Sequence, residues 1–413
     1  MNYTGGLHLK WLHLSDIHYN PKNDGRSTQQ LRDKLPRYII DKKITADYLF
    51  ITGDFRHAKY QKDDDGITAK NAVQFILRIA DAARIDHANI HIVPGNHDLS
   101  RSEDKLRINE IKRQYNAHNG RFQDCDLTFL KKRFGFFQQI VCELKAQGVP
   151  TPMPEMHFCW HGVKETPEFS LLFLNTCIIC NSDEDRGSLI IGNYDLYHCL
   201  EELRQKAPEK PVIVLAHHGM DNFRTDERKA VENLFRDYPI KLYLCGDAHT
   251  TWRRSTNKFV EITMGGLLQD NNVRTVFSVG EMKNEKIQIK AHEWDADTNR
   301  WGEYTQLNDE LNDIFGCVAQ SNPKMLDPLH LQLRNQFKSV RKRDREKVSE
   351  EAISLASILW EKFQDGYAGI YLLDLARLRN DASTMGKLYV ELNKSEELTV
   401  RAAVKKWYVK WGR

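Results

Sequence analysis

The chain has 413 residues, 41% hydrophobic and 28% charged, a composition typical of a globular protein with two or three domains. Lys and Arg number 60 against 57 Asp and Glu, so the overall charge does not indicate nucleic-acid binding. No apolar run approaches the roughly 18 to 20 residues that span a bilayer, so we expect no membrane partner. The eight cysteines are scattered, as in proteins of reducing compartments, which predicts a cytoplasmic location.

Three stretches near the start of the chain have the apolar pattern of β-strands, and each ends in polar side chains. These strands are expected at residues 9–14, 48–52 and 90–93, with helical patterns at 28–43 and 71–83 between them. In such a β-α-β-α-β progression, functional groups gather at the carboxyl ends of the strands. The polar groups are Asp16 and His18 after the first strand, Asp54 after the second, and Asn96, His97 and Asp98 after the third.

Two further strands with polar endings lie downstream. Residues 211–216 run into His217 and His218, and residues 241–245 run into Gly246, Asp247, Ala248 and His249. A single histidine after a strand is more often a structural residue than a ligand. Five strand ends in the order Asp-x-His, Gly-Asp, Asn-His, His and Asp-x-His are much harder to explain as structural residues. Carboxylate, imidazole and amide groups in this combination can bind divalent metal ions.

Over residues 7–301, these five blocks resemble the calcineurin-like metallophosphoesterases, in which the blocks occur in the same order. The resemblance implies an α/β fold, a β-sandwich flanked by helices, with two metal ions at the carboxyl ends of its strands. It also implies a hydroxide, activated by the two ions, that attacks phosphorus. Carried over by position, the implied first metal ligands are Asp16, His18, Asp54 and His249. The implied second set is Asp54, Asn96, His217 and Asp247, with Asp54 bridging, and His97 matches the proton donor.

Two positions depart from the family pattern. Asp247 stands where the last block usually has a histidine, and its oxygen ligand favours harder ions. We therefore expect two divalent ions, manganese first, with iron, magnesium and zinc as alternatives. The competing interpretation is that Asp247 does not reach the metal, leaving the second site weak or empty.

The second departure is at His57, where many relatives have an aspartate that orients the catalytic histidine. His97 is then oriented by Asp98 or by no residue that the sequence identifies, and we count Asp98 with His97 as catalytic. Arg56 and His57 are candidate substrate-binding residues because guanidinium groups pair well with phosphate. A solvated loop arginine is an equally good interpretation of Arg56.

An insertion at residues 99–154 follows the Asn96-His97 loop directly. Helical spacing at 102–116 and 127–147 predicts two helices within it. We expect either a helical cap over the metal cleft that selects the substrate, or a peripheral helical pair without substrate contact.

The pair Cys177-x-x-Cys180 is half of a zinc site or a redox motif. It follows an apolar strand pattern at residues 171–174, and no second pair lies at zinc-site spacing. The sequence favours two buried, reduced thiols.

The predicted domains are a metallophosphoesterase domain at 1–302, a polar linker at 303–328 and a helical C-terminal module at 329–413. Helices are expected at 349–363, 371–378 and 385–392. Basic residues cluster at 334–347 and, with aromatic residues, at 401–413, as on surfaces that bind nucleic-acid strands. The favoured alternative is a solvated helix face, with the tryptophans packed in the module's core or onto a protein partner.

The expected function is hydrolysis of a phosphodiester, namely a nucleotide, a cyclic nucleotide or a nucleic acid. The block at residues 12–18 resembles the bacterial phosphodiesterase and repair-nuclease branches of the family more than its protein phosphatases. The alternatives are a phosphomonoesterase acting on proteins or small metabolites, and a weakly active binding scaffold. Substrate choice depends on the shape of the insertion at 99–154.

Overall fold

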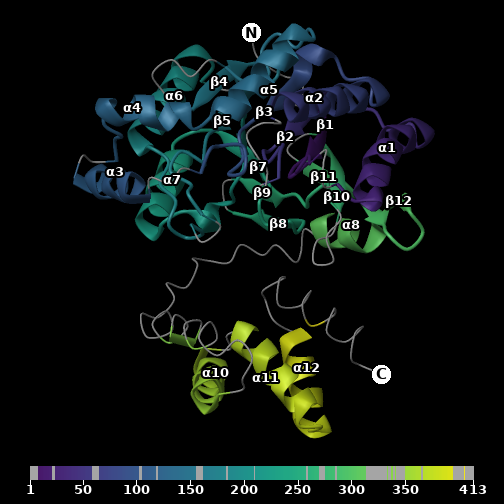
Figure 1. Ribbon diagram of the computed structural model, residues 1–413, viewed down its shortest axis with the longest axis vertical. Coiled ribbons are helices and arrows are strands. Elements are labelled where there is room, and N and C mark those ends of the chain that lie inside the picture. The colour runs from purple at the N-terminus through teal and green to yellow at the C-terminus, as the bar shows by residue number, and fades with distance from the viewer. Residues whose placement is uncertain are drawn as a thin grey trace. The chain divides into compact units, whose positions relative to one another are not determined.

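The structure is a computed structural model, and its chain divides into two compact units, Met1–Ala319 and Gln320–Arg413 (Figure 1). The described residues are 8–20, 24–57, 65–101, 105–117, 120–154, 161–182, 185–208, 210–256, 259–268, 275–283, 286–312, 333, 336–337, 340, 349–363, 366–393 and 404.

The first sheet of the N-terminal unit has the strand order β12-β11-β10-β1-β2-β3. Strands β1, β2 and β3 are parallel, and α1 and α2 connect them, as the β-α-β-α-β pattern predicts. Strand β10 pairs antiparallel with both β1 and β11. The elements are β1 (His8–Leu14), α1 (Arg26–Asp41), β2 (Tyr48–Ile51), α2 (Asp65–Ala82), β3 (Ile90–Ile92), β10 (Val276–Lys283), β11 (Lys286–Asp295) and β12 (Arg300–Glu303).

The second sheet has the order β4-β5-β6-β7-β9-β8. Its four central strands are parallel, which places their carboxyl ends at one edge. The elements are β4 (Gly162–Glu165), β5 (Ser170–Leu174), β6 (Val212–Ala216), β7 (Ile240–Cys245), β8 (Trp252–Ser255) and β9 (Val260–Thr263).

The two sheets pack face to face. Alternate residues of the second sheet, among them Phe173 and Leu215, share one core with the first sheet, because side chains along a strand point to opposite faces. Rings from the two sheets meet directly, with 5.7 Å between the centroids of His91 in β3 and Phe173 in β5. The intervening residues, such as Val214, pack in a second core against helices. The predicted α/β class with a helix-flanked β-sandwich is confirmed.

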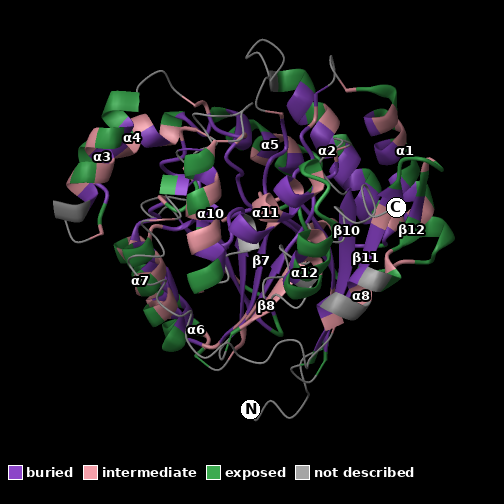
Figure 2. Cartoon of the chain, turned by 90° about the horizontal axis from the view of Figure 1, so that it is seen from below, coloured by how far each residue is buried: buried purple, intermediate pink, exposed green. Residues whose placement is uncertain are grey.

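Helices cover the sandwich, and Figure 2 shows buried strands beneath helices with exposed outer faces. The first core includes α1, α2 and α5, and the second includes α3, α4, α6 and α7. The insertion forms three helices where two were predicted, because the chain turns at Arg133 and Phe134. The insertion helices are α3 (Lys105–Ala117), α4 (Asp124–Lys132) and α5 (Gly135–Ala146), and α6 (Asn193–Lys206) and α7 (Thr225–Arg236) complete the layer.

The C-terminal border of the first unit differs from the predicted end at residue 302. Helix α8 (Thr305–Asn312), in the predicted linker, packs on β11. Its Asn308 Oδ1 accepts a hydrogen bond from the backbone N–H of Ala291, and its Leu311 is buried. This short polar helix belongs to the first unit because strand β11 supplies its partners. The linker residues 313–328 lie outside the described residues.

The C-terminal unit contains α10 (Glu350–Phe363), α11 (Gly366–Leu378) and α12 (Ala382–Asn393), close to the predicted helices. Trp360 packs with residues of α11 and α12 and with Val404. Apart from residues 336–337, 340 and 404, the basic stretches 334–347 and 401–413 lie outside the described residues.

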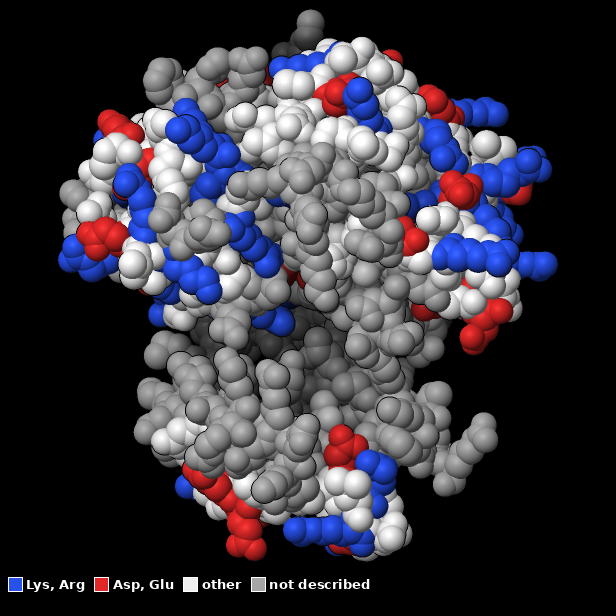
Figure 3. All heavy atoms as spheres, in the orientation of Figure 1, with Lys and Arg blue, Asp and Glu red and all other residues white. Residues whose placement is uncertain are grey.

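Within the described part of the chain, no helix is long and apolar enough to cross a bilayer. Basic and acidic side chains both occur across the visible face in Figure 3.

Candidate metal centre

The polar groups that follow the strands of both sheets come together, as the sequence predicts. Loops after β1, β2 and β3 contribute Asp16, His18, Asp54 and His97, and loops after β6 and β7 contribute His217, Asp247 and His249. Four overlapping groups of these side chains, one of which also includes His218, have ligand atoms within 4.8 Å of one another. The site therefore joins the two sheets at the carboxyl ends of their parallel strands.

One end of the site contains Asp16, His18 and His249. The Nε2 atom of His249 lies 3.1 Å from Asp16 Oδ1 and 3.1 Å from His18 Nε2. The carboxylate of Asp16 is fully buried, and its Oδ1 also lies 3.6 Å from His18 Nε2. Three ligand atoms thus converge on one point, which is the arrangement a divalent cation requires.

The other end of the site contains His217 and Asp247, and Asp54 lies between the two ends. Asp54 Oδ1 is 3.4 Å from His217 Nε2, whereas its Oδ2 is 3.5 Å from His18 Nε2. Asp247 Oδ1 lies 3.9 Å from His217 Nε2. Each carboxylate oxygen of Asp54 therefore faces a different group of ligands.

The donor atoms at this second end suit a metal ion. His217 Nδ1 donates to the backbone carbonyl oxygen of Thr52 at 2.6 Å, which leaves the lone pair of Nε2 for a metal. Within the described part of the chain, His217 Nε2 and Asn96 Oδ1 are buried and have no hydrogen-bond partner. Because unpaired buried polar atoms are costly, these residues fit a bound cation better than an empty site.

The backbone of the site is strained where it presents ligands. Asp16, His18, Asp54, Asp247 and His249 all have positive φ angles, between 47° and 63°. Residues other than glycine rarely adopt this conformation, and such strain concentrates at functional sites.

Close packing of the loops explains a glycine in the third block. A Cβ atom at Gly95 would lie 2.1 Å from the backbone nitrogen and from Oδ1 of Asp54. A side chain at Gly95 would therefore displace Asp54 from the centre of the site.

The charges of the site favour cations. Burial acts to raise the pKa of Asp54, but the neighbouring His217 and His97 outweigh it and hold this pKa far below its ordinary value. Burial acts to lower the pKa of His249, but Asp16 outweighs it and raises this pKa to about 9. The carboxylates thus remain ionised and hold positive charge close to them.

His97 lies at the margin of the site. Its side chain is 17% exposed, against 2% for Asp54, and its Nε2 lies 3.8 Å from Asp54 Oδ2. Its backbone N–H donates to Asp54 Oδ1 at 2.8 Å. Burial lowers the pKa of His97 to about 4 although Asp54 opposes this shift, so the ring is neutral at pH 7.

Asp98, predicted to be catalytic with His97, contacts the backbone of two loops. Its fully buried carboxylate accepts hydrogen bonds from the backbone N–H groups of Asp54, Phe55, Arg56 and Gly95, at 2.7 to 3.3 Å. These bonds join the loop after β2, which carries Asp54, to the loop after β3, which carries His97. Asp98 is thus placed to position the loops that carry Asp54 and His97.

Arg56 and His57, the two candidate substrate-binding residues, have different neighbours. The guanidinium group of Arg56 stacks over the Phe136 ring of α5 at 4.5 Å, and its Nε donates to the backbone oxygen of His97. This buried arginine supports the His97 loop. The ring of His57 lies 5.7 Å from that of His18, on the border of the metal site.

Comparison with known proteins agrees with this geometry. The sequence model of the family described as calcineurin-like phosphoesterase matches residues 9–251, which contain every predicted ligand. The chain belongs to this family. The family membership expected from the five strand-end blocks is therefore confirmed.

Individual relatives of this calcineurin-like phosphoesterase are distant. The metallophosphoesterase-like protein YydB of Bacillus subtilis (strain 168) is 25% identical over 318 residues, or 73% of this chain. The chain spans 62% of the length of that relative. Among solved structures, a dimetal phosphatase from Danio rerio is 13% identical, with a TM-score of 0.41, over 68% of this chain and 95% of its own. The protein TT1561 of Thermus thermophilus is 11% identical, with a TM-score of 0.36, over 72% of this chain and 98% of its own.

One residue outside the ligand sets implied by the sequence lies beside the candidate metal centre. His218 Nε2 is 3.8 Å from Asp247 Oδ1, so the rings of both His217 and His218 lie near this carboxylate. The His217-His218 doublet was the available signal, but consecutive residues on an extended strand point to opposite faces. The loop after β6 bends so that both rings approach Asp247.

Proposed function

We propose that this protein is a dinuclear metal-dependent phosphoesterase that hydrolyses a phosphodiester. The observation that carries the proposal is the Asp54 carboxylate, one oxygen of which faces His18 and the other His217. A carboxylate in this position suits a bridge between two cations, because one anionic group then offsets charge from both.

The proposed ligand groups are those expected from the sequence. Asp16, His18, Asp54 and His249 would hold one ion, and Asp54, Asn96, His217 and Asp247 the other. When bound, the ions would supply Lewis-acid stabilisation of phosphoryl charge and a reactive hydroxide at neutral pH. Oxygen ligands at Asn96 and Asp247 favour manganese, and iron, magnesium and zinc are the alternatives.

The residues of the chain have distinct tasks in this proposal. The ring of His97 holds a proton at Nε2 and delivers it to the departing oxygen of the ester. Because that ring is neutral when the site is free, proton uptake would accompany binding of the anionic phosphoester, whose charge stabilises the imidazolium ion. Asp98 and Arg56 keep the His97 loop in position through its backbone.

The substrate class rests on the first sequence block, whose likeness is to phosphodiesterase and nuclease branches. Nucleotides, cyclic nucleotides and nucleic acids are the proposed substrates, and the insertion at 99–154 is the proposed selector. Arg101, at the start of this insertion, donates from Nε to the backbone oxygen of Asn96 at 3.3 Å.

The helical C-terminal module is proposed to bind a protein partner. A cytoplasmic location is also proposed, and the buried reduced thiols support it.

The test compares hydrolysis of bis-p-nitrophenyl phosphate and p-nitrophenyl phosphate by metal-stripped protein resupplied with Mn²⁺. We expect manganese-dependent cleavage of the diester, abolished in Asp54→Asn. Preference for the monoester would favour the phosphomonoesterase alternative. Cleavage of neither ester by a protein that binds one ion or none would favour the binding scaffold.

A further inference from the structure

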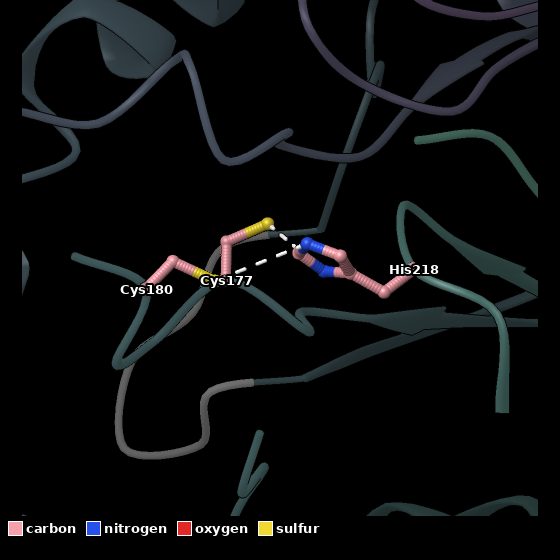
Figure 4. Close-up of side chains that lie close together, drawn as sticks. All are labelled: Cys177, Cys180 and His218. Carbon is pink, nitrogen blue, oxygen red and sulfur yellow. Dashed lines mark hydrogen bonds between the residues drawn. The ribbon is translucent and has the colours of Figure 1, made fainter. Parts of the chain in front are cut away.

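A second group of potential metal ligands lies behind Asp247, separate from the proposed catalytic ligands. Cys177 and Cys180 follow β5, and His218 follows the adjacent parallel strand β6 (Figure 4). Their ligand atoms all lie within 4.8 Å of one another. Cys177 Sγ is 3.8 Å from His218 Nδ1, and Cys180 Sγ is 4.0 Å from His218 Nε2. All three side chains are buried, so the group has the form of an internal site.

The surrounding residues hold this group in place. Thr176 Oγ1 accepts a hydrogen bond from the backbone N–H of His218 and lies 2.8 Å from its Nδ1. A hydrogen bond from Nδ1 to this hydroxyl leaves the Nε2 lone pair directed towards Cys180 and Asp247. The turn between the cysteines is fastened by the guanidinium group of Arg133, which donates to the backbone oxygens of Ile178 and Cys180.

We infer that Cys177, Cys180 and His218 form a buried zinc site, with the carboxylate of Asp247 as its fourth ligand. Asp247 Oδ1 lies 3.8 Å from His218 Nε2. In tetrahedral zinc sites with Zn–S bonds of about 2.3 Å and Zn–N bonds of about 2.0 Å, neighbouring ligand atoms are about 3.6 Å apart. The two separations at His218 Nε2, 4.0 Å to Cys180 Sγ and 3.8 Å to Asp247 Oδ1, are a few tenths of an ångström longer. Cys177 Sγ lies within 4.8 Å of the Cys180 and His218 ligand atoms, and the Asp247 carboxylate would turn towards the two thiolates to complete the site.

The chemistry of the ligands selects zinc. Two thiolates and an imidazole are soft to borderline ligands, which suit zinc better than manganese or magnesium. Two thiolates and one carboxylate around Zn²⁺ leave one net negative charge, and the Arg133 guanidinium beside the turn offsets it. The metal would be bound as the chain folds, because none of the three side chains is open to solvent.

This site also gives a reason for the aspartate at position 247. A carboxylate can contact two metal ions, whereas a neutral imidazole contacts one. Asp247 Oδ1 lies 3.9 Å from His217 Nε2 and 3.8 Å from His218 Nε2. The link to the catalytic centre rests on the proposed function, but the zinc site itself does not.

The test is X-ray absorption at the zinc edge of the full-length protein purified with zinc. We expect a zinc ion with two sulfur neighbours at about 2.3 Å and two nitrogen or oxygen neighbours at about 2.0 Å. The proposed catalytic ligands contain no sulfur, so sulfur scattering reports on the new site whether or not the catalytic site is loaded or active. A shell of nitrogen and oxygen alone overturns the inference, and this measurement needs no variant to fold.

A second experiment replaces zinc with Co²⁺ and compares cysteine variants. Wild-type protein loaded with Co²⁺ should show a thiolate-to-cobalt charge-transfer band, and Cys177→Ser/Cys180→Ser should lose it together with one bound zinc ion per chain. Cys199→Ser is the matched control, because Cys199 is a buried cysteine on α6 outside the group. Equal zinc content in the double variant and the control contradicts the inference. So does a Cys177–Cys180 disulfide found by peptide mapping of the native protein.

Discussion

Neighbouring residues of the third block have separate tasks. His97 lies at the margin of the metal centre and Asn96 is a proposed ligand, whereas the next side chain, Asp98, accepts hydrogen bonds from the backbone of two loops. The residue types predict the ligands, because few other groups bind metals. They do not predict the position of Asp98, since its partners at residues 54–56 are distant in sequence. The same limit applies to His218, whose neighbours come from two other strand ends.

The proposed role of His97 predicts a dependence on the leaving group. His97→Asn should slow hydrolysis of an alkyl phosphodiester by about 10²- to 10⁴-fold, because an alkoxide departs poorly without a proton. Hydrolysis of bis-p-nitrophenyl phosphate should fall much less, since p-nitrophenolate is a stable anion. The measurement compares kcat/KM for both esters at equal metal content. Equal losses for the two esters would remove proton donation from the role of His97.

The burial of His91 predicts that the free energy of unfolding falls in acid. The His91 ring stacks near Phe50 between the sheets, and burial lowers its pKa from 6.5 to about 3. Between these values the unfolded chain binds the proton and the folded chain does not. The contribution of His91 is therefore complete above pH 6.5 and is lost as pH falls towards 3, by about 1.4 kcal/mol per pH unit at most.

The check is the free energy of unfolding in urea from pH 7 to pH 4. His91→Phe keeps a ring in the core and should flatten this pH dependence relative to wild type. The control is His87→Gln, at a partly exposed histidine that pairs with Asp81 on the surface. An unchanged slope in His91→Phe would show that other groups cause the acid sensitivity.

At the scale of elements, strand pattern and strand endings were predictable but strand pairing was not. Short apolar runs locate β5, β6 and β7, yet they do not predict that β1 lies beside β10. The meeting of two sheet edges places His217 near Asp54, and the sequence predicts it only through the resemblance. The break between α4 and α5 was missed because the apolar spacing continues across Arg133, whose partners lie around residues 178–180.

Contact between strand-end loops predicts that Gly95→Ala is strongly destabilising. The new methyl group would meet Asp54 at 2.1 Å, so the loop must shift at a cost of about 1 to 3 kcal/mol. Metal affinity should fall with it. The control is Gly135→Ala on α5, where an added Cβ meets nothing within 4 Å. The loop-contact account fails if urea denaturation and manganese titration give the same values for both variants.

At the scale of the whole molecule, the boundary after Ala319 matters more than the predicted one at 302. Polar composition indicates a linker at 303–328, but Asn308 and Asn312 of α8 make hydrogen bonds to β11 through their side chains. The polar side chains of these asparagines pair with the strand backbone, so a polar helix can pack on the sheet. Composition alone does not distinguish such a helix from a solvated linker.

Truncation tests this boundary. A fragment of residues 1–319 should fold, bind metal and hydrolyse a small diester like the full chain, since its cores are complete. A fragment of residues 1–302 lacks α8, exposes the β11 surface beneath Leu311 and should melt at a lower temperature. Melting curves and diester hydrolysis of both fragments provide the measurement. Equal stability of the fragments would place α8 outside the functional unit, and an inactive but folded 1–319 would assign part of the site to the C-terminal unit.

In the proposed centre, the strand ends of two sheets hold two metal ions with Asp54 between them. Anomalous diffraction from crystals grown with Mn²⁺ would locate both ions and their ligands. We predict two manganese peaks about 3.5 to 4 Å apart. One should be bound by Asp16, His18, Asp54 and His249, and the other by Asp54, Asn96, His217 and Asp247. A single peak, or two peaks that do not share Asp54, would contradict the account.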